Sequence, residues 1–340
     1  MVDKNTDFFK IVDNFAKIVH VKSIPIFEAK LTSIPEVTIA IPTYRRATLL
    51  KEAIDSAINQ IDYNDYDIIV VDNNPERNDE TEELMLSYCN SHVSYYKNAE
   101  NIQMAGNWNR LFTLATGKYV VLLHDDDVLF PNFLKRIMIL SKKKNADLIK
   151  PLAYFSKEII NIQYKSTHTG KLKRIYDISN YYGNALGAPS GCLLKKECVL
   201  NIGGFNQDFY PSFDFCFEVL YAKKYKCYRL FETLFIYRLL ENTSSNTAVL
   251  DSFIKNDYFL HYQLLRNYHL PNYLIMKFLS YKFCNTIKNN RDLWEMPDYN
   301  FDIETVGLNS KDKTIGFLVA IFLKVYVFFC KLYLWNANNK

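Results

Sequence analysis

The stretch LLHDDDVLFPNFL, residues 122–134, places three consecutive aspartates directly after an apolar run that is typical of a buried strand. Like charges repel, and each carboxylate costs free energy to remove from water unless positive charge lies nearby. Two explanations are open: a solvated acidic turn ahead of the helix that begins at Pro131, or a divalent-cation site. The position at a strand end favours the cation, and Mg²⁺ or Mn²⁺ would keep open positions for a diphosphate.

Segments with strand-like and helix-like patterns alternate around this stretch. Apolar, strand-like runs lie at residues 37–42, 67–72, 92–96, 118–124 and 147–150, and helical spacing occurs at 49–61, 79–90, 105–116 and 131–144. The alternation predicts an α/β fold with a mostly parallel sheet and helices on both faces. Ligands of such sheets bind beyond the carboxyl ends of the strands. The motifs PTYRR, DNNP and HDDD all follow strands, which predicts one site at that edge.

Two of these motifs carry side chains that suit a nucleotide. Tyr44 can stack on a base and Thr43 can hydrogen-bond it, although Thr43 also suits a helix N-cap. Asp72 and Asn73 can hydrogen-bond a base or ribose, but Asn-Asn-Pro also favours a simple Asx turn. Taken alone, the turn is the better explanation of Asp72 and Asn73.

Composition places the chain among globular proteins without a nucleic-acid partner. It has 340 residues, 49% of them hydrophobic, enough for one large domain and an appendage. The net charge of +4 lies in residues 311–340, so no basic patch indicates nucleic acid. Seven scattered cysteines without metal-ligand spacing argue against disulfides or zinc and predict reduced thiols in the cytoplasm.

Both ends of the chain carry apolar residues at helical spacing. At the N-terminus, Phe8, Ile11, Phe15 and Ile18 predict an amphipathic helix, and the interspersed charges exclude a signal peptide. The segment 314–335 is long enough to cross a bilayer, but a lysine at its middle would cost about 2.5–3.5 kcal/mol there.

Lys313, Lys324 and Lys331 align on one side of the predicted C-terminal helix. We therefore expect this helix to lie in the headgroup layer of a membrane, where anionic lipids attract lysine. The alternative is packing against the rest of the protein or against a second subunit of a homo-oligomer.

Four motifs in order, IAIPTYRR, IIVVDNNP, NWNRLFTLATGKYVVLLHDDDVLFP and GGFNQDFYPSFDF, resemble a family 2 glycosyltransferase with the GT-A fold. The resemblance covers roughly residues 37–240 and implies a GT-A catalytic domain, which we place at 37–245. The helical patterns on either side predict a helical extension at 1–36 and a helical region at 246–340. The resemblance implies an inverting, metal-dependent transferase that uses a nucleotide-diphosphate sugar. UDP is the family's commonest carrier, and dTDP and GDP remain open. The implied acceptor is a glycan or a polyprenyl-diphosphate-linked glycan in surface polysaccharide assembly, at the inner face of the cell membrane.

The resemblance also assigns roles to residues. Its implied nucleotide-sugar contacts are Pro42, Thr43, Tyr44, Arg45, Asp72, Asn73, Asn109, Asp125 and, near the diphosphate, Arg238. Its implied ligands for Mn²⁺ or Mg²⁺ are Asp126 and Asp127, with His124 in the preceding position. Residues 188–191 precede a strand and are candidates for the wall of the sugar pocket, or for a simple turn.

Asp214 is the best match to the catalytic base, with Asp208 and Glu218 as rivals. Its phenylalanine neighbours would raise the pKa of the carboxyl group and strengthen it as a base. The alternative is a carboxylate that only stabilises a helix N-terminus. One base and one displacement would invert the sugar's configuration.

Two other functions remain open. A sugar-1-phosphate nucleotidyltransferase should have a glycine-rich basic loop after the first strand, and IPTYRRATLL has no glycine. A non-catalytic sugar-nucleotide-binding subunit is the other alternative, because Asn73, Cys216 and Leu240 stand where many family members carry acids or histidine.

Overall fold

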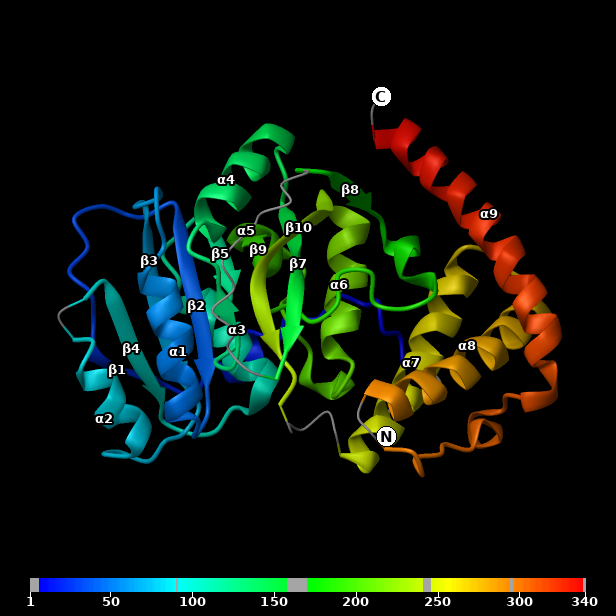
Figure 1. Cartoon of the computed structure of the whole chain (residues 1–340), viewed down its shortest axis with the longest axis horizontal. Helices are drawn as coiled ribbons and strands as arrows, with labels where there is room; N and C mark the ends of the chain where they lie inside the picture. Colours follow the sequence, from blue (N-terminus) through cyan, green and yellow to red (C-terminus); the bar gives the residue numbers. More distant parts are fainter. Residues whose placement is uncertain (1–5, 90, 158–169, 241–245, 294–295, 339–340) are drawn as a thin grey trace.

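A mixed sheet forms the centre of the computed structural model, which describes residues 6–89, 91–157, 170–240, 246–293 and 296–338 (Figure 1). The strands of this described part are β1 (Ser23–Phe27), β2 (Val37–Thr43), β3 (Tyr66–Asp72), β4 (Val93–Asn98), β5 (Tyr119–Leu122), β6 (Val128–Leu129), β7 (Leu148–Ser156), β8 (Leu172–Ile175), β9 (Cys192–Lys195) and β10 (Cys227–Arg238). Their order is β1-β4-β3-β2-β5-β9-β7-β10-β6, with β8 also paired to β10.

The strands β2, β3, β4 and β5, which the sequence predicted, are parallel to one another. β2 pairs with β3 and β5, and β3 pairs with β4, so their carboxyl ends meet at one edge. Thr43 lies opposite Asp72 in this register. The other half is mixed, because β9 runs antiparallel to both β5 and β7 while β10 runs parallel to β7. The α/β prediction is confirmed, and "mostly parallel" fits only the first half closely.

Helices cover both faces of the sheet, as predicted. They are α1 (Ala47–Ile58), α2 (Glu80–Leu86), α3 (Gln103–Leu114), α4 (Phe133–Lys144), α5 (Lys196–Asn201) and α6 (Phe213–Lys224). Side chains of a strand point alternately to its two faces. Ile39 and Ile41 of β2 accordingly join the core formed with α1 and α4, whereas Ala40 joins the core formed with α3, α5 and α6.

Local sequence explains two helix boundaries and one close approach. The carboxylate of Asp79 accepts a hydrogen bond from the Glu82 amide at 2.9 Å and caps α2. Asn145 ends α4 in the left-handed conformation, with a φ of 46°. Gly117 lies so close to β2 that a Cβ there would approach the Thr38 amide nitrogen to 2.6 Å.

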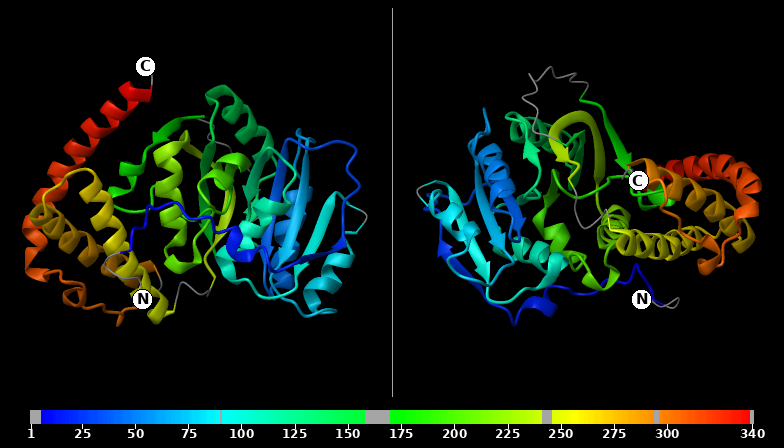
Figure 2. Two further views of the ribbon diagram at one scale, coloured as in Figure 1. Left: turned by 180° about the vertical axis from the view of Figure 1, so that it is seen from behind. Right: turned by 60° about the horizontal axis from the view of Figure 1, so that its bottom comes forward.

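The predicted N-terminal helix is wrong for the described residues of the extension. Residues 6–36 contain only a short 3₁₀ turn, Ala16–Ile18, and strand β1. Phe8 is buried, but Ile11 is 39% exposed, so the apolar residues share no helical face. The segment instead crosses from the helical region to the sheet, where the Arg110 guanidinium donates to the Ile18 and Val21 carbonyls (Figure 2).

The predicted C-terminal helical region is confirmed. α7 (Thr247–Asn267), α8 (Asn272–Leu293) and α9 (Lys313–Asn338) gather beside the sheet at one end of the molecule (Figure 1 and Figure 2). They share a core separate from the two that flank the sheet, and Phe278, Leu279 and Leu323 are fully buried within it. The domain boundaries at 36 and 245 stay predictions.

Candidate active site

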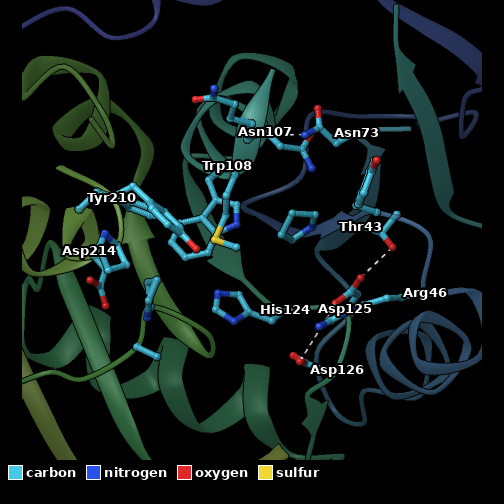
Figure 3. A pocket seen from close by; sticks show the side chains of 18 of the residues that line it. Thr43, Arg46, Asn73, Asn107, Trp108, His124, Asp125, Asp126, Tyr210 and Asp214 are labelled. Carbon is cyan, nitrogen blue, oxygen red and sulfur yellow. Dashed lines mark hydrogen bonds and ion pairs between the residues drawn. The ribbon is translucent and has the colours of Figure 1, made fainter. Parts of the chain in front are cut away.

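A cavity of about 540 Å³ opens at the carboxyl ends of β2, β3 and β5 (Figure 3). Its walls are formed by Pro42, Thr43, Tyr44, Arg46, Asn73, Asn101, Gln103, Met104, Asn107, Trp108, His124, Asp125, Asp126, Ala188, Pro189, Tyr210, Pro211, Phe213, Asp214, Tyr237, Val249 and Phe253. The three strand-end motifs therefore meet at one site, as their shared position in the sheet predicts.

On one wall, Thr43, Arg46 and two aspartates form a hydrogen-bonded array. The Thr43 hydroxyl donates to Asp125 Oδ2 at 2.8 Å. Arg46 Nη1 lies 2.9 Å from Asp126 Oδ2 and 3.3 Å from Asp125 Oδ1. Burial raises the pKa of Asp125 to about 6, against the opposing effect of Arg46. The arginine thus supplies part of the positive charge that the acidic triplet requires.

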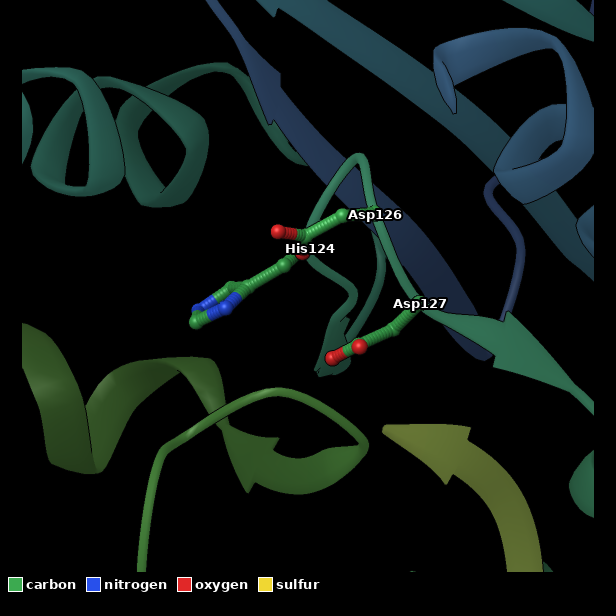
Figure 4. Close-up of side chains that lie close together, drawn as sticks. All are labelled: His124, Asp126 and Asp127. Atoms are coloured by element: carbon green, nitrogen blue, oxygen red, sulfur yellow. The ribbon is translucent and has the colours of Figure 1, made fainter. Parts of the chain in front are cut away.

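His124, Asp126 and Asp127 form the candidate cation group (Figure 4). Their possible ligand atoms all lie within 4.8 Å of one another. Asp127 Oδ1 accepts from the Arg238 amide at 3.0 Å, whereas Asp127 Oδ2 and His124 Nε2 are buried without a hydrogen-bond partner in the described part of the chain. Two unpartnered ligand atoms beside a carboxylate fit a divalent cation.

Burial sets the protonation of this group. It raises the pKa of Asp127 to about 7, with a further contribution from Asp126. It also lowers the pKa of His124 to about 4, so the imidazole is neutral near pH 7 and keeps a lone pair for a metal. Trp108 packs against this imidazole with ring centres 4.9 Å apart and holds it at the cavity wall.

Asp214 lies across the cavity from Arg46 and Asp125 (Figure 3). It belongs to the first turn of α6, and its Oδ1 accepts from the Phe215 amide at 2.8 Å. Burial raises the pKa of Asp214 to about 7, and the nearby Asp257 adds to the effect. A carboxyl group that titrates near neutral pH is suited to general base catalysis.

The two rivals of Asp214 do not line the cavity. Asp208 is exposed and pairs with Lys17 at 2.7 Å. Glu218 is buried and accepts from the Leu186 amide at 2.8 Å, which ties α6 to the preceding loop.

Two residues expected at the nucleotide lie outside the cavity lining and bond other parts of the protein. Asp72 is fully buried and accepts from Tyr95 at 2.9 Å and Lys97 at 3.0 Å, outside the cavity lining. Asn109 is also buried, and both ends of its amide bond the backbone of Phe205 at 2.8 Å. Asn109 therefore holds α3 to the segment that contains Phe205. These two hydrogen bonds use both polar groups of its amide.

Asn73 does reach the cavity wall, but its amide is fully used by the protein. Its Nδ2 donates to Asn101 and to the Gln103 carbonyl, and its Oδ1 accepts from Asn98 and the Ile102 amide. Since an amide has two donors and two acceptor sites, Asn73 shapes the wall and has no spare hydrogen bond for a base.

Arg45 and Arg238 were expected at the donor, but neither of them lines the cavity. Arg45 has a φ of 55° and turns outward to pair with Glu76 at 2.7 Å. The next residue, Arg46, consequently faces the aspartates, although the sequence prediction named only Arg45. Arg238 lies behind the acidic loop, where it bonds the Asp126 carbonyl and Glu52, and it does not line the cavity. Adjacent arginines at a strand end were the only sequence signal for Arg46.

This chain is similar in sequence and in fold to several known proteins. Residues 38–201 match the family described as Glycosyl transferase family 2. An uncharacterised glycosyltransferase of Rickettsia prowazekii is 32% identical over 223 residues, which cover 63% of this chain and 67% of the relative. The GalNAc(5)-diNAcBac-PP-undecaprenol beta-1,3-glucosyltransferase of Campylobacter jejuni is 26% identical over 216 residues, covering 62% and 67% of the two chains.

Among solved structures, S. aureus TarS 1-349 in complex with UDP-GlcNAc is similar to this chain. The TM-score is 0.57 at 14% sequence identity, and the match covers 79% of this chain and 77% of TarS 1-349. At this identity the likeness concerns the fold, which is of the GT-A type that the motifs predict.

Proposed function

The chain belongs to glycosyltransferase family 2, and from this premise we propose that it transfers a sugar, with inversion, from a nucleotide diphosphate to a hydroxyl group of a lipid-linked glycan. One observation carries the proposal. The Arg46–Asp125–Asp126 array and the carboxylate of Asp214 occupy opposite walls of one cavity, where a donor and an acceptor would meet (Figure 3).

The donor half of the cavity suits a nucleotide at its mouth. Tyr44 is 44% exposed beside the β2 end and can stack on a base, while the guanidinium of Arg46 can face phosphate oxygens. We propose a UDP-sugar as donor. The cocrystal of TarS with UDP-GlcNAc, in a protein of the same fold, makes that compound the first candidate to test.

His124, Asp126 and Asp127 would hold Mn²⁺ or Mg²⁺. When bound, such an ion supplies positive charge that stabilises a departing diphosphate. Arg46 adds a second positive group at the same wall, bonded to two of the aspartates. The chain would therefore place positive charge next to the diphosphate that leaves the donor.

Asp214 acts as the general base in this proposal. It removes the proton from an acceptor hydroxyl, whose oxygen then forms a bond to the anomeric carbon as the bond to the diphosphate breaks. Since attack and departure take place on opposite faces, the configuration inverts without a covalent sugar–enzyme intermediate. Trp108 and Phe213 pack against each other at 5.1 Å beside the base and limit the access of water.

A lipid-linked acceptor agrees with the surface of α9. One side of this helix, including Val319, Leu323 and Val327, is buried in the helical core. The opposite side exposes Ile315, Phe317, Leu318, Ile321, Phe322, Val325, Phe328, Phe329, Leu332, Tyr333 and Trp335. The exposed Lys324 borders that apolar side. We propose that α9 lies in the headgroup layer of an anionic membrane.

Length and composition also allow Ser310–Ala337 to cross a bilayer. The packing of α9 favours the surface position, because a Cβ at Gly316 would meet the Lys277 carbonyl oxygen at 2.1 Å, so the helix is closely seated on α8. The named substrate of the Campylobacter relative is itself attached to undecaprenol by a diphosphate, which supports an acceptor held at a membrane.

Donor turnover on membranes tests the proposed function. Full-length protein is mixed with liposomes that contain a polyprenyl-diphosphate glycan, Mn²⁺ and each of a panel of UDP-, dTDP- and GDP-sugars, and nucleotide release and glycan mass are measured. We expect mass gain with one donor, and its loss in Asp214→Asn but not in the surface control Asp208→Asn. Donor binding without any mass gain, unchanged by Asp214→Asn, would instead support the non-catalytic alternative.

A further inference from the structure

One face of α7 holds the segment that carries the candidate base. Asn256 Nδ2 donates to the carbonyls of Phe209 and Tyr210 at 3.1 and 3.0 Å. The Ser212 hydroxyl donates to Asp257 Oδ1 at 3.0 Å. Two adjacent residues of α7 therefore fix the chain directly before Asp214.

Ser212 has an uncommon role for its position. It is the N-cap residue of α6, where a serine side chain ordinarily accepts a hydrogen bond from the first turn. Here it makes no such cap and instead donates its hydroxyl proton to Asp257. The first turn of α6, which contains Asp214, is thus oriented from α7 rather than by its own cap.

The same face of α7 also forms part of the cavity and of the packing behind it. Val249 and Phe253 line the cavity, and Asp257 and His261 follow at intervals of four residues on that side of the helix. The His261 ring stacks on Phe215 at 4.9 Å. A C-terminal element outside the sheet consequently forms the acceptor side of the site.

Lys282 of α8 provides the opposite charge to Asp257. It is 3% exposed, and its attraction to Asp257 opposes the effect of burial, which lowers the pKa of the ammonium group to about 8. Asp257 in turn raises the pKa of Asp214 by repulsion. Removing the charge of Asp257 would therefore leave Lys282 without its partner and favour the ionised form of Asp214.

We infer that Asp257 is a positioning residue for the base: through Ser212 it orients the first turn of α6 and the carboxylate of Asp214, so that α7 and α8 are working parts of the catalytic site. The inference rests on the proposed role of Asp214. The competing explanation is that the contact between α6 and α7 only stabilises the fold.

Two variants separate orientation from charge. Asp257→Asn keeps an oxygen that can accept from Ser212 but removes the charge, and Ser212→Ala removes the hydrogen bond but keeps the charge. The double variant Asp257→Asn with Lys282→Met removes both buried charges and serves as the folded reference if Asp257→Asn alone is unstable. Unfolding midpoints of all variants establish that the measurements concern folded protein.

The first readout needs neither donor nor acceptor. In full-length protein labelled with ¹³C at the aspartate carboxyls, the signal of Asp214 is the one missing from Asp214→Asn, and its titration gives the pKa. We expect a lower pKa in Asp257→Asn. The other titratable groups near these two carboxyls are Cys216, Glu218, Tyr237, His261 and Lys282, and they are common to both proteins.

The second readout compares the change in kcat with the change in KM for the donor. The donor is the nucleotide sugar identified with the panel of UDP-, dTDP- and GDP-sugars. We expect kcat to fall about tenfold in Ser212→Ala with KM unchanged, and Ser212→Thr to restore it, because only the acceptor side is disturbed. Titration of Asp214 that is identical in Asp257→Asn and the parent, or full kcat in Ser212→Ala, would overturn the inference. Absence of turnover in the parent protein would contradict the proposed function instead. In that case the titration of the Asp214 carboxyl group would still decide whether Asp257 acts on Asp214.

Discussion

The guanidinium of Arg46 lies 2.9 Å from a carboxylate oxygen of Asp126, a residue that also belongs to the candidate cation group. Asp126 therefore contacts Arg46 and would also bind the cation, on the wall of the cavity where we propose that the donor binds. The negative charge of the aspartates is compensated only when both Arg46 and a divalent cation are present. We therefore expect donor binding to depend on both.

Replacing Arg46 tests the array. Arg46→Met should weaken binding of UDP in the presence of Mn²⁺ by about tenfold, or ~1.4 kcal/mol, because Asp125 and Asp126 would lose their shared cation. Isothermal titration calorimetry measures the change. The matched control is Arg45→Met, which removes an exposed pair with Glu76 and should leave the affinity almost unchanged. Equal effects of the two variants would show that Arg46 is not a donor contact.

The cation group predicts a direct metal-binding phenotype. Mn²⁺ should bind the parent protein without nucleotide, and Asp127→Asn should bind it at least about tenfold more weakly, because the carboxylate loses its charge at constant size. Electron paramagnetic resonance of free Mn²⁺ gives both affinities, with Asp208→Asn as control. Binding that is unchanged by Asp127→Asn would place the ion elsewhere.

The pKa of Asp214 predicts the pH profile. Only the ionised carboxylate can accept a proton, so kcat/KM should rise as pH increases through about 7 and then level off. Asp214→Asn should lower kcat by about 10²–10⁴-fold at the plateau, the usual range for a general base. A profile without a transition between pH 6 and 8 argues for another base.

The same shift predicts how stability depends on pH. The folded-state pKa of Asp214 lies above its ordinary value of 3.8, so the folded protein holds this proton more tightly than the unfolded chain. The contribution of Asp214 to stability should therefore fall as pH rises from about 4 to 7. Urea unfolding at pH 5 and pH 8 should show a smaller loss of stability in Asp214→Asn than in the parent. An equal loss in both proteins would contradict the raised pKa.

Asn109 distinguishes a scaffold role from a nucleotide contact. Asn109→Ala should destabilise the protein by about 2–4 kcal/mol, because it leaves a buried amide and a buried carbonyl of Phe205 unpaired. Urea unfolding measures the loss, and UDP affinity of the folded fraction should be preserved. Weaker UDP binding with normal stability would restore the role that the sequence suggested.

The exposed side of α9 predicts lipid binding. Phe322→Asp together with Phe329→Asp should reduce sedimentation with vesicles of phosphatidylserine and phosphatidylcholine by tenfold or more, because both side chains lie on the apolar surface. The control is Ile61→Asp, which adds an acidic group at a 52% exposed apolar position outside α9. If the parent protein stays in the supernatant, or the paired variant pellets normally, α9 has another partner.

Much of the site could be expected from local pattern. Strand periodicity and the polar residues after each strand predicted a common edge, and Thr43, Tyr44, Asn73, Asp125, Asp126 and Asp214 all line the cavity. All but Asp214 lie at or follow the carboxyl ends of strands that share one edge of the sheet. Asp214 was suggested by the family resemblance.

Other assignments depended on contacts that no local pattern encodes. Asp72 and Asn109 were expected at the nucleotide, but in the structure they bond Lys97 and the Phe205 backbone, both distant in sequence, outside the cavity lining. The N-terminal segment was expected to be helical, but Arg110 and Gln263 bond its backbone in an extended path.

By itself the sequence determined the alternation of strands and helices between residues 37 and 150, the family and the acidic loop at the sheet edge, because these follow from periodicity and from short motifs. Only the tertiary structure decided which arginine faces that loop, since a single positive φ at Arg45 exchanges the directions of two neighbouring side chains. It alone brought Asp257 of α7 to Ser212 of α6, because that contact joins residues 45 positions apart and arises only when the helical region packs against the sheet domain.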